Sequence, residues 1–175
     1  MLHHPAYRGH FAQNLRHGIP RVPLISAFRE CTVIGKELVS LHVGFETGER
    51  FDLTWIEQDK LPYSTRVVGR MQLNTATGTV SVNPSLTLTG IPQAAFDYVL
   101  GTRSALEWVV DQFRLEQDDE GRIISDPNRS EDEEYIVQLI ERVTHVSLRT
   151  VELISQLPKE VGFSAVNANA ESVNN

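Results

Sequence analysis

Alternation of hydrophobic and polar residues is clearest between residues 66 and 89, where it predicts a β-hairpin. Two alternating runs, residues 66–73 and 79–89, are joined by a five-residue loop that ends in Gly78. Successive side chains of a strand point to opposite faces, so the hairpin should have one apolar face and one polar face. The apolar face is predicted to contain Val67, Met71, Leu73, Val80, Val82, Leu86 and Leu88.

Helical spacing of apolar residues flanks this hairpin on both sides. Ser104 and Glu107 form a capping box, in which each residue satisfies a free backbone N–H group of the other, and Ser130 with Glu133 repeats the pattern before the longest apolar-periodic stretch. The fold class expected is therefore α+β: a β-hairpin-containing antiparallel sheet packed against several helices, with a long C-terminal helix. The predicted helices cover residues 7–16, 26–41, 93–100, 104–113 and 130–157, and a short strand is predicted near 51–55.

The length of 175 residues fits one domain with a sizeable core. We expect a single domain over residues 1–160, with an extended connection where Pro20 and Pro23 restrict the backbone. The Asn/Ala/Ser-rich residues 161–175 are expected to form a disordered tail.

The distribution of charge matters more than its sum. The formal net charge is −7, which by itself argues against a nucleic-acid partner. The acidity, however, is concentrated in residues 111–175, which hold 14 acidic and 6 basic residues. No acidic residue lies between Lys60 and Asp97, so this segment can face phosphate without like-charge repulsion.

The polar hairpin face therefore becomes the candidate binding surface. Arginine, glutamine and asparagine hydrogen-bond to base edges, and a two-stranded ribbon fits the major groove of DNA. The alternative is an ordinary solvent-facing sheet surface, on which serine and threonine are common. The candidate DNA-binding residues are Lys60, Arg66, Arg70, Gln72 and Asn83.

Enzyme chemistry is not indicated by the sequence. It contains no glycine-rich phosphate loop, no His-Glu-x-x-His and no cysteine pair, so we expect no catalytic residue, no metal site and no cofactor. The N-terminal histidines are expected to be solvated or to lie on a helix surface, and Cys31 and Trp108 to be core residues. No apolar run approaches the roughly 20 residues of a membrane span, and one cysteine suits a reducing cytoplasm.

Several stretches, taken in order, resemble the C-terminal specificity region of type ISP restriction–modification enzymes and related adenine-specific DNA methyltransferases. The resemblance runs over roughly residues 3–158, and no single stretch is diagnostic. It is carried by Tyr7-Arg8, Ile19-Pro20-Arg21-Val22-Pro23, Gly35-Lys36-Glu37-Leu38-Val39, Gly90-Ile91-Pro92, Arg103-Ser104-Ala105-Leu106-Glu107-Trp108, Asp111-Gln112-Phe113 and Asp126-Pro127-Asn128.

The resemblance implies a non-catalytic module that recognises duplex DNA beside the methyltransferase and helicase parts of the same bacterial defence system. The nuclease, ATPase and methyltransferase parts of such enzymes have no counterpart here, so we expect a fragment or a detached subunit. Arg103 and Trp108 are expected to be scaffold, since members of the family read different sites. A second hypothesis is a docking or scaffold module of such an assembly without DNA contact, which the acidic last third favours.

Overall fold

The computed structural model of the chain describes residues 2–18 and 25–159. The chain divides into two compact units: a helical unit of residues 1–39 with 153–175, and a sheet unit of residues 40–152. The predicted proline-rich connection at residues 19–23 and the predicted tail at 161–175 lie outside the described residues. Within the described part, no helix is both long and apolar enough to cross a membrane.

The helical unit begins with α1 (Pro5–His10) and α2 (Ala12–His17), where the sequence predicts one continuous helix. Phe11, which separates them, has backbone angles of φ −105° and ψ 19°, outside the helical range. The next helix is α3 (Phe28–Val43), in which Cys31 is buried, as predicted. Its buried residues are Cys31, Ile34 and Leu38.

His4 anchors the start of the helical unit. Its Nδ1 accepts a hydrogen bond from the Ala6 N–H at 3.1 Å, and its Nε2 donates to the carbonyl oxygen of Pro158 at 2.7 Å. The ring is only 2% exposed. The expectation that the N-terminal histidines are solvated is therefore wrong for His4, because this imidazole caps α1 and holds the chain after α5.

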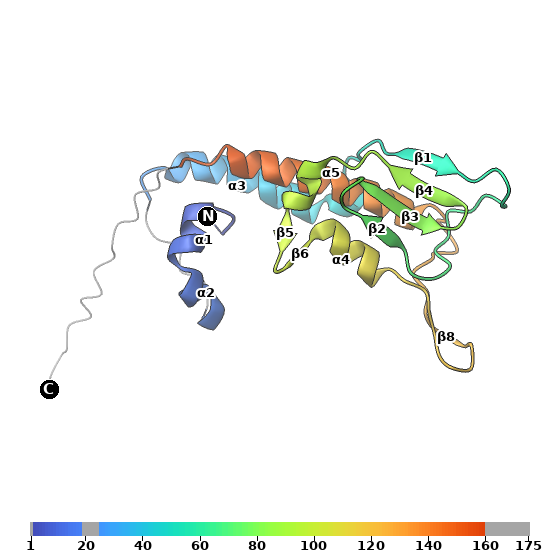
Figure 1. Ribbon diagram of the computed structural model, residues 1–175. Coiled ribbons are helices and arrows are strands. Elements are labelled where there is room, and N and C mark those ends of the chain that lie inside the picture. The colour runs from blue at the N-terminus through green and yellow to red at the C-terminus, as the bar shows by residue number, and fades with distance from the viewer. Residues whose placement is uncertain (1, 19–24, 160–175) are drawn as a thin grey trace, which may run out of the picture. The chain divides into compact units, whose positions relative to one another are not determined.

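The sheet unit is built on a four-stranded antiparallel sheet in the order β1-β4-β3-β2 (Figure 1). The strands are β1 (Thr54–Glu57), β2 (Gln72–Asn74), β3 (Thr79–Asn83) and β4 (Leu86–Thr89). The predicted alternation is confirmed, since buried Val80 and Val82 alternate with half-buried Thr79 and Ser81 along β3.

The apolar face of the sheet packs on α5 (Tyr135–Ser155), which runs behind the sheet in the view of Figure 1. From the sheet come Val80, Val82, Leu86 and Leu88, all at most 2% exposed. The residues that α5 contributes to the same core are Tyr135, Ile136, Val137, Leu139, Ile140 and Val143. This arrangement confirms the predicted α+β class.

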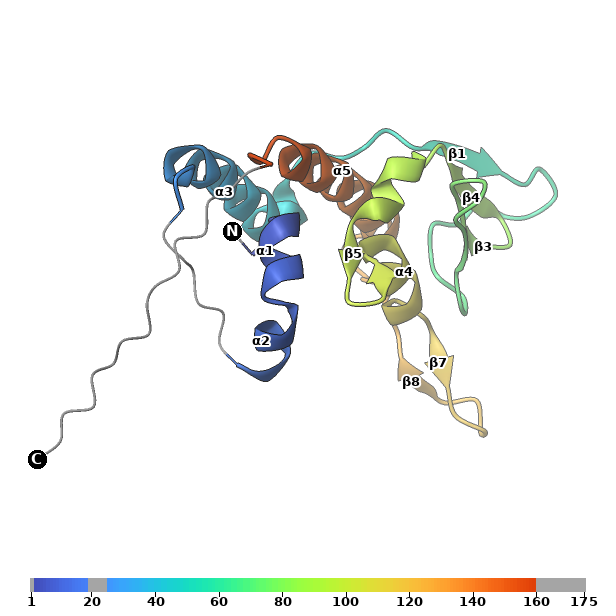
Figure 2. The ribbon, with the colours of Figure 1, turned by 60° about the vertical axis from the view of Figure 1, so that its left-hand side comes forward.

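The remaining elements of the sheet unit are short. Helix α4 (Ala105–Gln112) begins with the predicted capping box of Ser104 and Glu107. Beyond α4 a small hairpin extends away from the helix in both ribbon views (Figure 2). The other bounds are η1 (Phe45–Thr47), η2 (Gln93–Asp97), β5 (Val99–Leu100), β6 (Arg103–Ser104), β7 (Glu116–Gln117) and β8 (Ile123–Ser125).

Four predicted elements differ from the structure. The run 79–89 is not one strand but β3 and β4, which pair with each other through a turn at Pro84 and Ser85. Residues 66–71 are not in a strand. The longest helix begins at Tyr135 rather than at the second predicted capping box, and the helix predicted over 93–100 is a 3-10 helix that ends at Asp97.

Candidate nucleic-acid interface

The outer face of the sheet carries short polar side chains in register. Gln72 of β2 pairs with Ser81 of β3, and Ser81 pairs with Thr87 of β4. The Ser81 and Thr87 hydroxyls lie 3.3 Å apart, while Gln72 is exposed at the sheet edge. This face offers hydrogen-bonding groups without a carboxylate, as the sequence predicts.

The side-chain amide of Asn83 forms its hydrogen bonds within the protein. Its Oδ1 accepts from the backbone N–H groups of Ser85 and Leu86 at 2.7 and 2.9 Å. Its Nδ2 donates to the carbonyl oxygens of Ser64 and Arg66 at 2.7 and 2.8 Å. The amide therefore shapes the β3–β4 turn and ties it to the 64–66 segment, and its polar atoms do not lie open on the sheet face. Ser85, in the same turn, is buried.

The predicted basic residues lie along one end of the sheet rather than across its face. Glu57 pairs with Leu86, and Gln72 pairs with Ser81, so residues 58–71 connect β1 to β2 past the β3–β4 turn. This segment contains an exposed lysine, a half-buried arginine and an exposed arginine, which are Lys60, Arg66 and Arg70 respectively. The structure brings Arg70 next to Gln72, and it leaves Lys60 at the opposite edge strand.

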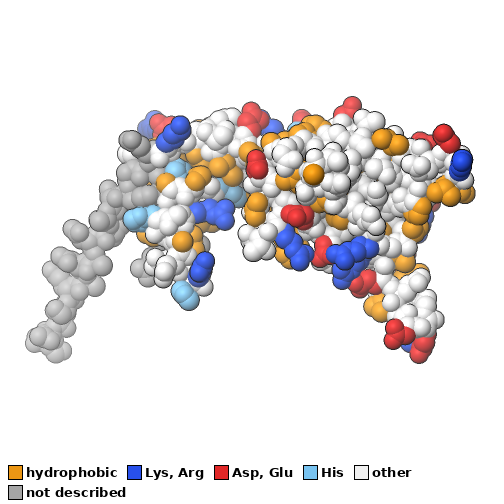
Figure 3. Space-filling model, viewed as in Figure 1, with side chains coloured by type: hydrophobic (Ala, Val, Ile, Leu, Met, Phe, Trp, Pro, Cys, Tyr) orange, Lys and Arg blue, Asp and Glu red, His pale blue; other side chains and the backbone are white. Residues whose placement is uncertain are grey.

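Three arginines meet at one carboxylate, Asp111 of α4. Arg70 Nη2 lies 2.9 Å from Asp111 Oδ1, and Arg103 Nη1 lies 3.0 Å from Asp111 Oδ2. Arg114 Nη1 approaches Oδ1 at 3.4 Å, and its Nε is also bonded to Glu116 at 2.5 Å. Figure 3 shows blue side chains gathered over the α4 region of this face. We call Arg70, Arg103, Arg114 and Asp111 the arginine cluster.

The arginine cluster borders a groove of about 590 Å³ between β2 and α4. The Arg70 and Arg103 side chains are 71% and 51% exposed, so both are accessible from solvent. The hydrogen bond from Arg103, helped by the charges of Arg103, Arg114 and Arg70, lowers the pKa of Asp111 below its ordinary value. The groove is lined by Arg70, Met71, Gln72, Leu73, Thr75, Arg103, Glu107, Val110 and Asp111.

Trp108 lies beside the cluster and is 46% exposed, so the expectation that it is a core residue is wrong. Its Nε1 donates to the carbonyl oxygen of Leu100 at 3.2 Å. The Arg103 guanidinium lies over its ring, 5.8 Å from the centroid, a cation–π distance. Arg103 is thus held on one side by a carboxylate and on another by an aromatic ring.

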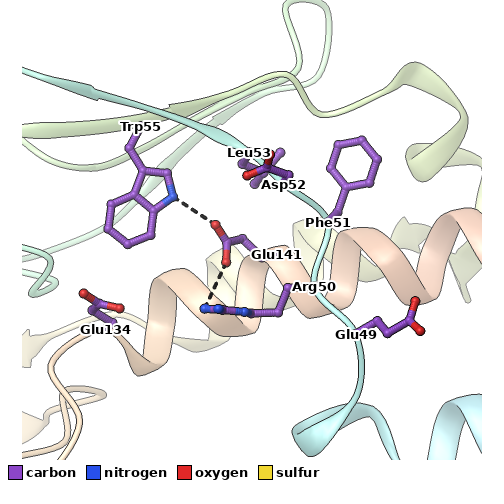
Figure 4. Close-up of a pocket in the computed structure, with 8 residues that line it drawn as sticks. All are labelled: Glu49, Arg50, Phe51, Asp52, Leu53, Trp55, Glu134 and Glu141. Carbon is purple, nitrogen blue, oxygen red and sulfur yellow. Dashed lines mark hydrogen bonds and ion pairs between the residues drawn. The ribbon is translucent and has the colours of Figure 1, made fainter.

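A second pocket, of about 770 Å³, has the opposite character (Figure 4). Glu141 of α5 accepts a hydrogen bond from Trp55 Nε1 at 2.9 Å and lies 3.6 Å from Arg50 Nη1. Three more carboxylates line the pocket, which disfavours phosphate. The hydrogen bond between Trp55 and Glu141 in this pocket joins β1 to α5. The lining carboxylates are Glu49, Asp52, Glu134 and Glu141.

The sequence prediction named Arg70 and Gln72, which both line the groove, but it did not name Asp111, Arg103 or Arg114 as binding residues. The only signal for them was the spacing of Asp111 and Arg114, three residues apart at the end of a predicted helix. Within residues 2–18 and 25–159, no group of three or more histidine, cysteine, aspartate or glutamate side chains is placed to hold a metal ion.

The fold and this groove define an α+β domain with a polar, arginine-bearing edge. The chain belongs to the Type ISP C-terminal specificity domain family, whose model matches residues 1–141. A comparison with curated proteins found no match.

Solved structures of three proteins are similar to the chain. They are a nuclease-deletion mutant of the Type ISP restriction-modification enzyme LlaGI in complex with a DNA substrate mimic (35% identity, TM-score 0.78), the ATP-dependent Type ISP restriction-modification enzyme LlaBIII bound to DNA (31%, 0.80) and a DrdV–DNA complex solved by cryo-EM (33%, 0.74). The likeness covers 91%, 93% and 91% of this chain, but only 13%, 11% and 17% of theirs.

Proposed function

We propose that this chain is a non-catalytic DNA-recognition module of a Type ISP-like restriction–modification system. The observation that carries the proposal is the family match together with structural likeness, at 31–35% identity, to chains solved with DNA. Its partners in this proposal are duplex DNA and the methyltransferase and helicase-like parts of the same system. Such a module needs no cofactor of its own and works in the bacterial cytoplasm, where its DNA lies.

The proposed DNA contacts lie along residues 58–72. Arg70 and Gln72, adjacent at the groove, are proposed to reach base edges or phosphates. Lys60 and Arg66 are proposed to contact phosphates of the DNA backbone. Asn83 is proposed to act indirectly, because its amide holds the backbone of Arg66 in place. The absence of acidic side chains between Lys60 and Asp97 supports this assignment.

The test is binding of the 175-residue chain to duplex DNA at low salt. Wild type is compared with Arg66→Ala/Arg70→Ala and with a control, Arg29→Ala/Arg122→Ala, that removes the same charge from other exposed positions. We expect the affinity of the first variant for duplex DNA to fall by about tenfold or more, and the affinity of the control to fall less. Equal binding by both variants would remove the 58–72 segment from the proposal.

A docking role is the second candidate, and the β7–β8 hairpin favours it. Ile123 and Ile124 are 57% and 67% exposed there, and the loop beside them is acidic, which suits a protein surface better than DNA. Co-purification with a methyltransferase subunit, together with an absence of DNA crosslinks to residues 60–90, would support docking without DNA contact.

A further inference from the structure

We infer that Asp111 is a positioning residue that presents Arg70 and Arg103 as a paired clamp for one backbone phosphate of duplex DNA. This inference rests on the proposed function and extends it, because neither Asp111 nor Arg103 was among the predicted contacts. The cluster is drawn from separate parts of the chain: Arg70 from the segment before β2, Arg103 from strand β6, Asp111 from helix α4, and Arg114 from just after the end of α4.

The geometry leaves the clamp open towards solvent. Each carboxylate oxygen of Asp111 receives one of the two arginines, at 2.9 and 3.0 Å through a single terminal nitrogen. A guanidinium has five N–H donors, so each arginine keeps donors for a second acceptor. Arg114 differs, because its Nε is engaged by Glu116 and its side chain is only 39% exposed. Arg70 and Arg103 are therefore the two available cations.

Asp111 fixes side chains that would otherwise be mobile. A free arginine loses rotamer entropy when a ligand immobilises it, so an arginine already held by a carboxylate binds phosphate at a lower entropic cost. Arg103 is restrained further by the Trp108 ring beneath it. The carboxylate also cancels charge, so the cluster contributes local geometry more than long-range attraction.

These two effects of Asp111 on DNA binding have opposite signs, which makes the inference testable. Asp111→Asn adds one unit of positive net charge, and by simple electrostatics the chain should then bind DNA more tightly. If Asp111 positions the arginines, the same variant binds duplex DNA about three- to tenfold more weakly despite the added charge. Asp119→Asn, at an exposed position of the β7–β8 loop, is the matched charge control.

The experiment measures the affinity of the 175-residue chain for several unrelated duplexes over a range of salt concentrations. We expect Asp111→Asn to weaken binding to all of them and Asp119→Asn not to weaken it. We expect Arg103→Ala to weaken binding uniformly and to reduce the slope of log K against log salt by about one, as a phosphate contact does. NMR relaxation of the arginine Nε groups should show Arg70 and Arg103 more mobile in Asp111→Asn.

Each other outcome has one meaning. Tighter or unchanged binding by Asp111→Asn would show that the carboxylate only dampens charge, and would overturn the inference while leaving the proposed function intact. If Arg103→Ala changes the preference among DNA sequences and leaves the salt slope unchanged, Arg103 contacts a base edge and not a phosphate. That result would overturn the proposed phosphate clamp. Failure of wild type to bind any duplex at low salt would overturn the proposed function, and the inference with it.

Discussion

Gly78 closes the β2–β3 loop in a way that no other residue can. Its φ of +63° lies in the left-handed region, and a Cβ atom built there would lie 2.2 Å from the carbonyl oxygen of Ile91. The Ile91 N–H in turn donates to the Gly78 carbonyl oxygen at 3.1 Å. Conformation and space both require glycine at this position.

Replacing Gly78 by alanine should therefore cost more stability than the same change at Gly90. Gly90 also has a positive φ, +93°, but open space surrounds its Cα. We expect Gly90→Ala to lower the free energy of unfolding by about 1–2 kcal/mol and Gly78→Ala to lower it further, because the backbone at Ile91 must shift. Urea unfolding at neutral pH measures the free energy of unfolding of both variants. Equal losses of stability would contradict the close approach of Gly78 to Ile91.

Asn83 shows where residue-level prediction from sequence fails. Polar alternation continues through it, so the pattern places its side chain on the open face with Ser81. The Asn83-Pro84 dipeptide is also a turn signal, and its amide is used in the β3–β4 turn. Periodicity alone cannot separate one strand of eleven residues from two short strands with a turn between them.

Among the elements, α4 was predicted best, because its signals are local. Ser104 Oγ accepts from the Glu107 N–H at 3.2 Å, and Glu107 Oε2 accepts from the Ser104 N–H at 2.7 Å. The hydrogen bonds from the Ser104 backbone and side chain lower the pKa of Glu107 below its ordinary value of 4.5. The ionised carboxylate is therefore the form that stabilises the helix start.

The capping box should make stability depend on pH in a defined direction. Because the folded-state pKa of Glu107 is lowered, its contribution is fully present above pH 4.5 and is lost as the pH falls through the folded-state value. The difference in unfolding free energy between wild type and Glu107→Gln should be constant from pH 7 to about 5 and shrink below it. Ser104→Ala should cost about 1 kcal/mol at pH 7 and remove most of this difference. A difference that stays constant down to pH 3 would contradict the role.

The start of α5 was predicted wrongly, for a reason outside local sequence. Ser130 and Glu133 match a capping box, yet the helix begins only at Tyr135. Residues before it are held by distant partners: Asn128 exchanges two hydrogen bonds with the backbone of Val67, and Thr65 donates to the carbonyl oxygen of Glu133. These tertiary bonds compete with the first turn of the predicted helix.

On the scale of the molecule, the sequence predicts which elements exist better than which ones meet. Class, core face and the order of helices and strands follow from periodicity. The arginine cluster does not, because Arg70 and Asp111 are 41 residues apart, and the Trp55–Glu141 contact spans 86. Such pairs are set by packing of the whole sheet unit, which no local pattern encodes.

Few cations are available for DNA in a chain of net charge −7, and this limits the salt dependence of binding. With about four cationic side chains at the phosphates, those of Lys60, Arg66, Arg70 and Arg103, the slope of log K against log salt should be no steeper than about −4. Titrations of the chain with a duplex between low and moderate salt measure it. A much steeper slope would mean that basic residues outside these four carry the binding.

The β2–β3 loop also shows how the surface beside the groove can be redesigned. The Asn74 side chain fixes the first end of the loop, because its Oδ1 accepts from the N–H groups of Ala76 and Thr77, and the backbone of Gly78 fixes the other end against Ile91. The three residues between them are exposed, and Thr75 reaches the groove. A library randomised only at residues 75–77 would keep the scaffold intact while varying the rim next to Arg70 and Gln72, and so offers a practical way to select altered site preference.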